Sequence, residues 1–398
     1  MTLLQEASAI SGEIAELRHA IHREPEIGHD LPRTRDKVLA ALDGLPLEIS
    51  QGSELTSVTA VLRGGRPGPV VLLRGDMDAL PVTEATGLPY ASRFAGVMHA
   101  CGHDLHTAML AGAARLLSAR QAELPGGVIF MFQPAEEGGH GARMMIEEGV
   151  LDVAGKRPVA AYGMHVQSHQ LGHGVFAVRP GPALAAADRL YVTVRGRGGH
   201  ASAPQHSADP IPAACEMVTA LQTLVTRRFD VFDPVVVTVG SFHAGTTDNV
   251  IPDEAVFKTT LRSFSKVSRD RLRDETARLV RDIAAAHGLT AEAEYIPGYP
   301  VTLNDPAEAS FAGETVAGLF GAARIVTPAA PLTGAEDFSY VLNEVPGAFV
   351  LLGACPPDAD PATVPSNHSA AARFDDGVLA DGAALYAELA LRRLDAGG

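Results

Sequence analysis

Apolar runs that end in polar residues constrain the fold of this chain more than any other feature. The stretches PVVLLRGDMDALPV (69–82) and GGVIFMFQPAEEGG (126–139) each begin as a strand buried on both faces would, and VAAYGMHV (159–166) is a third such run. A helical pattern at 104–119 separates the first two. Strands that alternate with helices predict an α/β domain with a mostly parallel sheet.

The middle of the chain follows a different pattern. Half-exposed strands and two long helices occur in the order β-α-β-β-α-β, the split βαβ arrangement of ferredoxin-like domains. The stretches RPGPA (179–183) and PGYP (297–300) bound this region and are candidate hinges. We therefore predict an inserted domain at 183–297 and a catalytic domain formed by 1–182 and 298–398.

Charge and cysteine content exclude several classes of partner and compartment. The net charge is −15 without a block of Lys or Arg, which argues against nucleic acid and anionic membranes as partners. No apolar run is long enough to cross a bilayer, and the N-terminus lacks the apolar core of a signal peptide. The three cysteines are too few and too scattered for a disulfide framework, so we expect a cytoplasmic protein.

Side chains able to bind a metal gather where the predicted strands end, the place where open α/β sheets bind ligands. These residues are Asp76, Asp78, Cys101, His103, Glu136, Glu137, His165 and His368. Each has an ordinary explanation when taken alone, because a Cys-x-His pair is more often core or capping and paired glutamates are usually solvated. Their shared position favours a functional site.

The donor types among these residues indicate which metal they suit. Thiolate and imidazole favour zinc, cobalt, nickel or manganese over magnesium or calcium. Five ligands are more than one catalytic zinc needs, whereas two metals that share a bridging ligand use five naturally. We interpret the five as Cys101, acting as a bridging thiolate, with His103, Glu137, His165 and His368.

Seven motifs resemble the aminoacylase/carboxypeptidase metallohydrolases of metallopeptidase family 20, subfamily D. Within that family they are most similar to the hippurate hydrolase and indole-acetyl-amino-acid hydrolase branch. In chain order the motifs are RGDMDALP, MHACGHDLHTA, QPAEEGGHGA, GMHV, GRGGHASAP, TTDNVIPD and NHSA. The resemblance implies the same five ligands, with Glu136 as general base, and two divalent transition-metal ions per chain. The ions are expected to be zinc or manganese, with nickel or cobalt as alternatives.

One departure from the sibling branches affects the expected ligand set. Those branches take their first ligand from a His-x-Asp motif, whereas this chain has Asp76-Met77-Asp78. The resemblance therefore implies that His103 replaces the lost histidine. Asp78 is expected to orient an imidazole ligand instead of binding metal itself.

The resemblance also implies that the inserted domain acts as a lid and forms a homodimer interface. His200, in GRGGHASAP, is expected to stabilise the oxyanion in its own or the partner's site. Asn249 and Arg262 are candidates for binding the substrate carboxylate, although Arg262 could equally be a surface strand residue. Gln205 stands near a position where relatives often have histidine.

The predicted function is a metal-dependent amidohydrolase that cleaves N-acyl or N-aroyl L-amino acids into a carboxylic acid and a free amino acid. A hydroxide between the two metals is expected to attack the amide, with Glu136 as general base. The alternatives are a metallo-dipeptidase or carboxypeptidase, and a non-catalytic metal-binding protein on the same fold. Glu136 argues against the last, since a pure binding site needs no spare base.

Overall fold

The computed structural model describes residues 1–396, and the chain forms two compact units. Unit 1 comprises Met1–Ala183, Leu303–Ala330 and the chain from Asp337 onward. Unit 2 comprises Leu184–Thr302 together with Pro331–Glu336. The chain passes between the units in β7 (Gly181–Leu184) and β14 (Thr302–Asn304), and again on either side of Pro331–Glu336.

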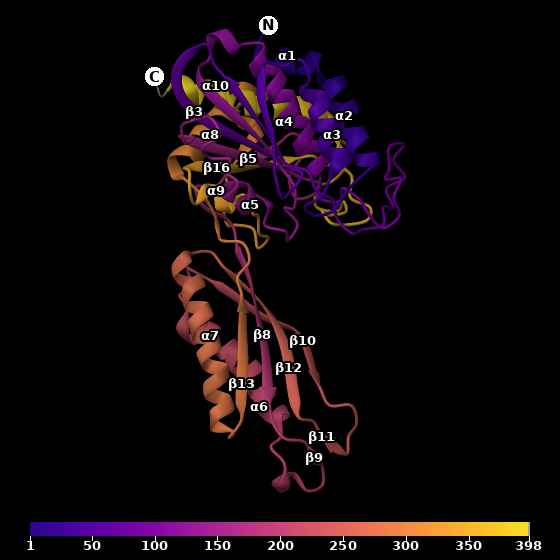
Figure 1. Cartoon of the computed structure of the whole chain (residues 1–398), viewed down its shortest axis with the longest axis vertical. Coiled ribbons are helices and arrows are strands. Elements are labelled where there is room, and N and C mark those ends of the chain that lie inside the picture. The colour runs from indigo at the N-terminus through magenta and orange to yellow at the C-terminus, as the bar shows by residue number, and fades with distance from the viewer. Residues whose placement is uncertain (397–398) are drawn as a thin grey trace. The chain divides into compact units, whose positions relative to one another are not determined.

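A mixed eight-stranded sheet forms the centre of unit 1 (Figure 1). Across the sheet the strands are β1 (Leu47–Gln51), β2 (Val58–Arg63), β4 (Pro125–Gln133), β3 (Arg66–Asp76), β5 (Ala160–Gln167), β16 (Gly347–Gly353), β6 (Phe176–Ala177) and β15 (Ile325–Val326). The four central strands β4, β3, β5 and β16 run parallel, while β1, β2 and β6 pair with antiparallel neighbours. The predicted α/β class with a largely parallel central sheet is confirmed.

Helices pack around this sheet. They are α1 (Leu3–Ala9), α2 (Ser11–Arg23), α3 (Pro32–Leu42), α4 (His103–Ser118), α5 (Gly141–Glu147), α8 (Pro306–Phe320), α9 (Ser339–Leu342) and α10 (Leu379–Asp395). The apolar pattern near the N-terminus looks continuous, yet the structure breaks it at Ile10, where φ is −102° and ψ is 6°. Ser11 and Gly12 follow the break and are weaker helix formers than alanine or leucine.

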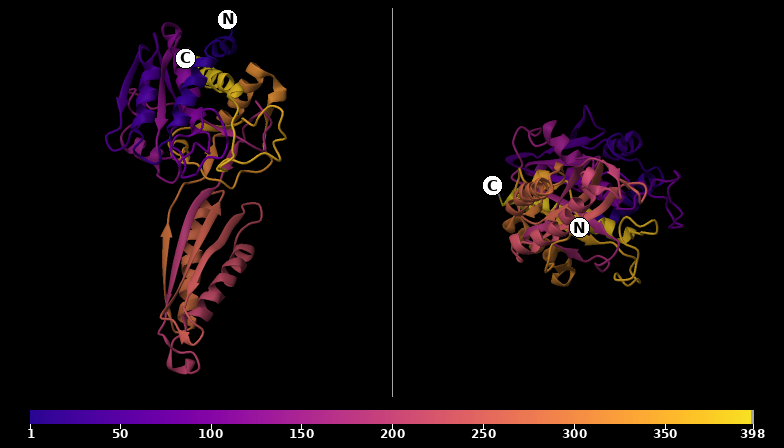
Figure 2. Two further views of the ribbon diagram at one scale, coloured as in Figure 1. Left: turned by 90° about the vertical axis from the view of Figure 1, so that its right-hand side faces the viewer. Right: turned by 90° about the horizontal axis from the view of Figure 1, so that it is seen from below.

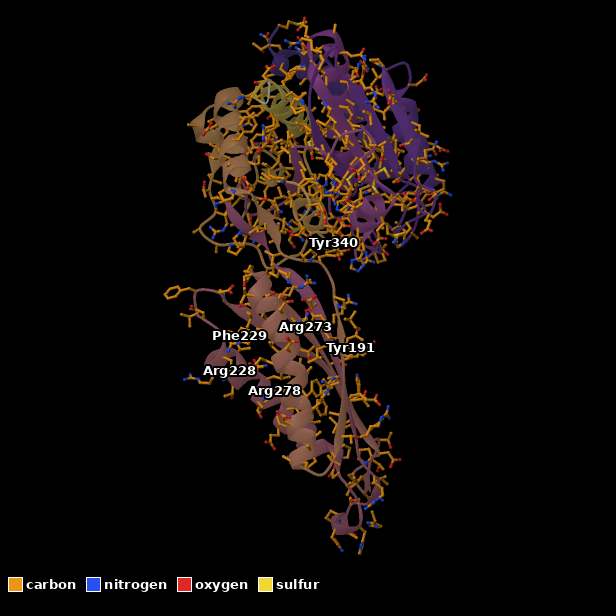
Figure 3. All side chains as sticks on the ribbon, turned by 60° about the vertical axis from the view of Figure 1, so that its left-hand side comes forward. Tyr191, Arg228, Phe229, Arg273, Arg278 and Tyr340 are labelled. Carbon is orange, nitrogen blue, oxygen red and sulfur yellow. The ribbon has the colours of Figure 1, made fainter. Side chains whose placement is uncertain are left out.

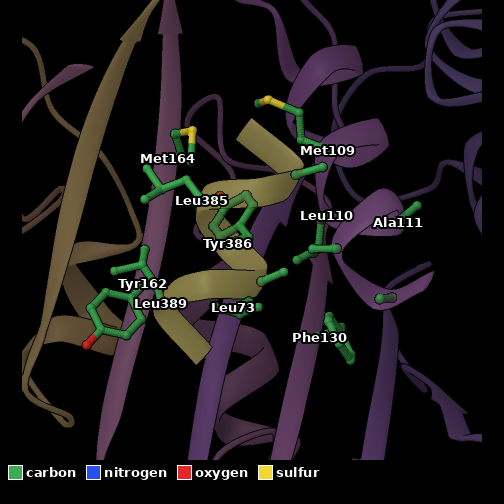
Figure 4. Packing of buried hydrophobic residues seen from close by; sticks show 14 of the residues in the cluster. Leu73, Met109, Leu110, Ala111, Phe130, Tyr162, Met164, Leu385, Tyr386 and Leu389 are labelled. Carbon is green, nitrogen blue, oxygen red and sulfur yellow. The ribbon is translucent and has the colours of Figure 1, made fainter. Parts of the chain in front are cut away.

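The core of unit 1 lies where α4 and α10 meet the sheet. Figure 4 shows Leu385 and Tyr386 of α10 beside Met164 of β5, with Met109 and Leu110 of α4 facing them. All five side chains are buried, and burial of one such side chain contributes about 1.5–3 kcal/mol. This packing fixes α4 firmly, and α4 begins at one of the predicted metal ligands.

Unit 2 contains a four-stranded antiparallel sheet in the order β10 (Val235–Ala244), β12 (Glu254–Ser263), β8 (Ala186–Arg195) and β13 (Thr290–Ile296). The helices α6 (Pro210–Arg228) and α7 (Lys266–Ala286) cover one face of it (Figure 2). Burial alternates along β8, as expected for a strand covered on one side. Arg273 and Arg278 lie along α7, and Arg228 lies at the end of α6 (Figure 3).

The segment Pro331–Glu336 belongs to unit 2 although it is far from the inserted region in sequence. The backbone amide of Ala185 lies 3.0 Å from the carbonyl oxygens of both Leu332 and Gly334. These contacts hold the segment beside the first residues of unit 2. Within residues 1–396, no helix combines the length and apolar composition needed to span a bilayer.

Candidate metal centre

Five side chains with metal-binding atoms lie close together in unit 1. They are Cys101 and His103 at the start of α4, Glu137 after β4, His165 in β5 and His368 in a loop after β16. The sulfur of Cys101 lies 3.3 Å from His165 Nε2 and 3.2 Å from His368 Nε2. His368 Nε2 also lies 3.2 Å from Glu137 Oε1. Segments separated by up to 267 residues thus converge on one sulfur atom.

These atoms form two groups that share one member. Donor atoms of Cys101, His103 and His165 lie within 4.8 Å of one another, and so do those of Cys101, Glu137 and His368. Cys101 belongs to both groups, so its sulfur is the atom that they share. Thiol, imidazole and carboxylate groups are donors that suit divalent transition metals.

The turn between Cys101 and His103 requires glycine. Gly102 has a φ of 89°, in the region that only glycine adopts without strain. A Cβ atom at this position would lie 2.4 Å from Val166 Cγ2. The Cys-Gly-His sequence is therefore a sharp entry into α4 that presents a thiol and an imidazole to the same space.

Several buried polar atoms at the centre lack hydrogen-bond partners among residues 1–396. They include both ring nitrogens of His103, and Oε1 of Glu137, which lies 3.2 Å from His368 Nε2. A buried polar atom left unpaired costs about 1–3 kcal/mol. Cations coordinated by these atoms would remove that cost, so the side chains fit a pair of metal ions.

Burial and neighbouring charges set which of these donors carry a proton in the metal-free chain. Burial raises the pKa of the Cys101 thiol to about 12, against the opposing effect of His103. Burial disfavours a charge on His103 too, but Asp76 and Cys101 outweigh it and hold the pKa of His103 well above its usual range. Burial and the neighbouring His106 hold the pKa of His165 well below its usual range. Binding of a cation must therefore displace protons from the thiol and from one imidazole.

Asp78 connects one ligand to the segment that carries another. Its two carboxylate oxygens accept the backbone amides of Glu136 and Glu137 at 2.9 and 3.0 Å. One of these oxygens also lies 3.5 Å from His103 Nδ1. Both oxygens are thus engaged with neighbouring groups, which matches a role in orienting the ligands.

Glu136 lies beside the ligands and is only 6% exposed. One of its carboxylate oxygens is within 4.8 Å of the donor atoms of His103 and Glu137. Glu136 Oε1 accepts the backbone amide of Asp337 at 3.3 Å. The preceding Ala135 has a φ of 59°, a left-handed conformation that is uncommon for alanine and turns the chain sharply after β4.

Asp76 was among the candidate metal-binding residues, but its buried pairing with His106 was not predicted. His106 Nδ1 lies 2.5 Å from Asp76 Oδ1, and His106 Nε2 accepts the backbone amide of Val166 at 2.8 Å. Since Nε2 accepts, the proton is on Nδ1, and both nitrogens of His106 are occupied. Arg74 Nη1 donates to the other oxygen of Asp76 at 2.7 Å. The spacing of His103 and His106, one turn apart on α4, is the signal that could have revealed this pair.

The candidate residues of unit 2 separate into two places. His200, in β9 (Gly199–His200), pairs with Val250 of β11 (Val250–Ile251), and the carbonyl of Asn249 accepts the amide of Ala201 at 3.1 Å. His200 and Asn249 are therefore neighbours, and both are exposed. Gln205 is exposed in the short helical turn Pro204–His206, which follows His200 in the chain.

Arg262 lies at the other end of the unit 2 sheet. It pairs with Ala187 near the start of β8, whereas Glu254, close to β11 in the chain, pairs with Arg195 at the end of β8. Eight residues of extended strand correspond to about 26 Å. Asn249 and Arg262 of a single chain are therefore too far apart to bind the same carboxylate.

The chain matches a known family of peptidases. The family model described as Peptidase family M20/M25/M40 matches residues 72–392. The chain belongs to this peptidase family. The family resemblance and the assignment as a hydrolase of amide bonds are thereby confirmed.

The proteins similar to this chain include enzymes named for different reactions. N-acetylcysteine deacetylase of Bacillus subtilis is 39% identical over 346 residues, covering 87% of this chain and 89% of the relative. Thermostable carboxypeptidase 2 of Saccharolobus solfataricus is 36% identical over 394 residues, covering 98% of both. The Bacillus subtilis YXEP protein, described as a dinuclear metal binding peptidase from the M20 family, is 35% identical with a TM-score of 0.83. That comparison covers 98% of this chain and 99% of YXEP.

Proposed function

We propose that this chain is a metal-dependent amidohydrolase that cleaves N-acyl or N-aroyl L-amino acids into a carboxylic acid and a free amino acid. The observation that carries the proposal is the buried Glu136 carboxylate beside two donor groups that share Cys101. A pure metal-storage site has no use for an extra carboxylate positioned in this way. The similarity to N-acetylcysteine deacetylase supports a substrate with an acylated amino group.

Two divalent transition-metal ions are proposed as cofactors, zinc or manganese first and nickel or cobalt as alternatives. Cys101, His103 and His165 would hold one ion, and Cys101, Glu137 and His368 the other. When bound, the ions supply Lewis acidity, which lowers the pKa of water and polarises a carbonyl group.

Glu136 is proposed to move the proton during hydrolysis. It accepts a proton from the attacking water and returns it to the nitrogen of the breaking amide bond. The water oxygen remains on the carbonyl carbon, and the amino acid leaves as a neutral amine that is then protonated in water. Asp78 accepts the backbone amide of Glu136, and the backbone amide of Asp337 donates to the Glu136 carboxylate. Glu136 therefore needs little reorganisation before proton transfer.

His200 is proposed as the donor that stabilises the oxyanion. Its Nδ1 accepts the backbone amide of Ser202 at 3.2 Å, so the ring proton is on Nε2 and available in an exposed position. The distance between Asn249 and Arg262 supports the proposal that substrate carboxylates are bound with help from two copies of the chain. We accordingly propose a homodimer that involves unit 2.

The substrate class is tested by comparing kcat/KM on metal-loaded protein. N-benzoylglycine and N-acetylcysteine should be hydrolysed faster than dipeptides with a free amino group. A carboxypeptidase or dipeptidase is the second candidate, supported by the similarity to thermostable carboxypeptidase 2. Faster cleavage of dipeptides, or of N-blocked peptides over simple N-acyl amino acids, would support this second candidate and contradict the first.

A further inference from the structure

The side chain of Asn367 joins three loops that carry proposed metal ligands. It immediately precedes His368 and reaches both the Cys101 segment and the end of β5 after His165. Asn367 is half-buried and lies in a stretch without a helix or strand. It is the first residue of the NHSA motif, in which only His368 has been given a role.

Both the oxygen and the nitrogen of the Asn367 side-chain amide are hydrogen-bonded. Oδ1 accepts the backbone amide of Ser168 at 2.9 Å, and Nδ2 donates to the carbonyls of Val166 at 3.0 Å and Cys101 at 3.2 Å. The Ser168 hydroxyl lies 2.9 Å from both Asn367 Oδ1 and the Pro365 carbonyl, and its single proton serves one of them at a time. The opposite amide orientation would oppose donor to donor and acceptor to acceptor, so the assignment is unambiguous.

These hydrogen bonds connect Asn367 to Cys101 directly and to His165 through the Val166 carbonyl. Val166 O, which accepts from Asn367, also accepts from His165 Nδ1 at 2.8 Å. That bond puts the ring proton of His165 on Nδ1 and leaves Nε2, 3.3 Å from the Cys101 sulfur, free for a metal. A change in the position of the Val166 carbonyl would therefore rotate the His165 ring.

The backbone of His368 has a conformation that is uncommon for residues other than glycine. Its φ is 70°, in the left-handed region, and its backbone amide donates to Ala100 O at 2.8 Å. A non-glycine residue keeps such a conformation only when its surroundings require it. The hydrogen bonds of the Asn367 side chain and the bond from the His368 amide to Ala100 O hold His368 in this conformation.

We propose that Asn367 is a positioning residue that sets the geometry of Cys101, His165 and His368 as one unit. This inference rests on the proposed metal centre. Three of the five donors depend on a single amide, so its loss should affect both metal positions through their shared sulfur. Partners that orient metal ligands typically change metal affinity by about 10- to 100-fold when they are removed.

Asn367→Asp gives the sharpest test because charge and geometry predict opposite results. The carboxylate keeps the contact with the Ser168 amide but places an oxygen against two carbonyl oxygens. Its added negative charge alone would tighten cation binding. The positioning role predicts weaker binding instead, by about 10- to 100-fold. Asn343→Asp, at an exposed asparagine of unit 1, is the matched control and should leave affinity unchanged.

The measurement is a titration of metal-free full-length protein with Co²⁺ in the presence of a competing chelator, followed by absorption. The thiolate-to-cobalt band and the ligand-field bands report the bond to Cys101 and the site geometry. In Asn367→Asp and Asn367→Ala we expect weaker binding together with shifted or weakened bands. Parental affinity and spectrum in both folded variants would overturn the inference.

Two controls separate this inference from the proposed metal centre. If the parental protein binds no Co²⁺, the metal centre itself is wrong; if it binds two ions and the variants match it, only the role of Asn367 is wrong. Thermal unfolding of each metal-free variant is measured first, and Asn367→Ser is used if Asn367→Asp does not fold. Failure of all three variants to fold, with or without Co²⁺, would make Asn367 a folding determinant and also overturn the positioning role.

Discussion

The functional side chains of unit 1 and those of unit 2 are held in opposite ways. In unit 1, Glu136 and His103 are buried; Asp78 accepts the backbone amide of Glu136, and one of its oxygens lies 3.5 Å from His103 Nδ1. In unit 2, His200 and Asn249 are exposed at a short two-stranded antiparallel sheet, and Ser202 is hydrogen-bonded to the His200 ring. Apart from the exposed His368, the donors of unit 1 are buried or half-buried and already close together, whereas His200 and Asn249 need another surface to become part of a site.

The largest expected effect tests the buried side of this contrast. Glu136→Gln removes the proposed base but leaves the five donor side chains, so kcat for N-acyl amino acids should fall by about 10²–10⁴ while metal content stays near two ions per chain. Steady-state kinetics and elemental analysis on the same preparation check this. Near-parental turnover would assign the base to another group.

His200→Ala tests the exposed side and should have the next largest effect. Loss of an oxyanion donor lowers kcat by about 10²–10³ with little change in KM, because the donor acts mainly in the transition state. Mixing inactive Glu136→Gln chains with inactive His200→Ala chains should restore part of the activity if two copies share their sites. Absence of recovery after demonstrated subunit exchange would mean that His200 serves its own chain or has no catalytic role.

Cys101→Ser tests whether the shared sulfur joins both metal positions. A serine hydroxyl stays protonated where a thiol ionises on a metal, so both ions should bind more weakly, by at least about tenfold. Competition with a chelator measures each affinity. Loss of one ion with unchanged affinity for the other would show that Cys101 is not a bridge.

The smallest expected effect concerns a buried ionic cluster around Asp104 of α4. His22 lies against Asp104 at 2.9 Å and Glu84 at 3.3 Å. Burial lowers the pKa of His22, but these carboxylates outweigh burial and Arg18 and raise it to about 9. Nearby His99 stays neutral, because burial lowers its pKa to about 3.

A raised pKa means that the folded state binds the His22 proton more tightly than the unfolded chain does. The resulting stabilisation, on the order of 3 kcal/mol, is complete below about pH 6.5 and disappears as pH rises through about 9. Urea unfolding at pH 6.5 and pH 10 should therefore show a smaller pH dependence in His22→Gln than in the parental protein. Equal pH dependence in the two proteins would contradict the charged state of His22.

Several features of the fold and the metal centre could be predicted from sequence because they depend on local patterns. Apolar runs such as 127–132 mark strands buried on both faces, and the polar residues that follow them must meet at one edge of a parallel sheet. The Cys101-Gly102-His103 turn is local as well, since its geometry follows from a glycine at the start of a helix. Apolar periodicity alone did not reveal the break at Ile10, where the pattern continues through two helices.

By itself, then, the sequence determined the fold class and the chemical types of the donors, because apolar period and residue type are properties of neighbours in the chain. Only the tertiary structure decided how the donors are held and which candidates can act together. Asn367 meets Cys101 and Val166 across 266 and 201 residues, and the amide's orientation follows from all its partners at once. Asn249 and Arg262 are close in sequence yet lie at opposite ends of one sheet, because an extended strand moves the chain about 3.3 Å per residue.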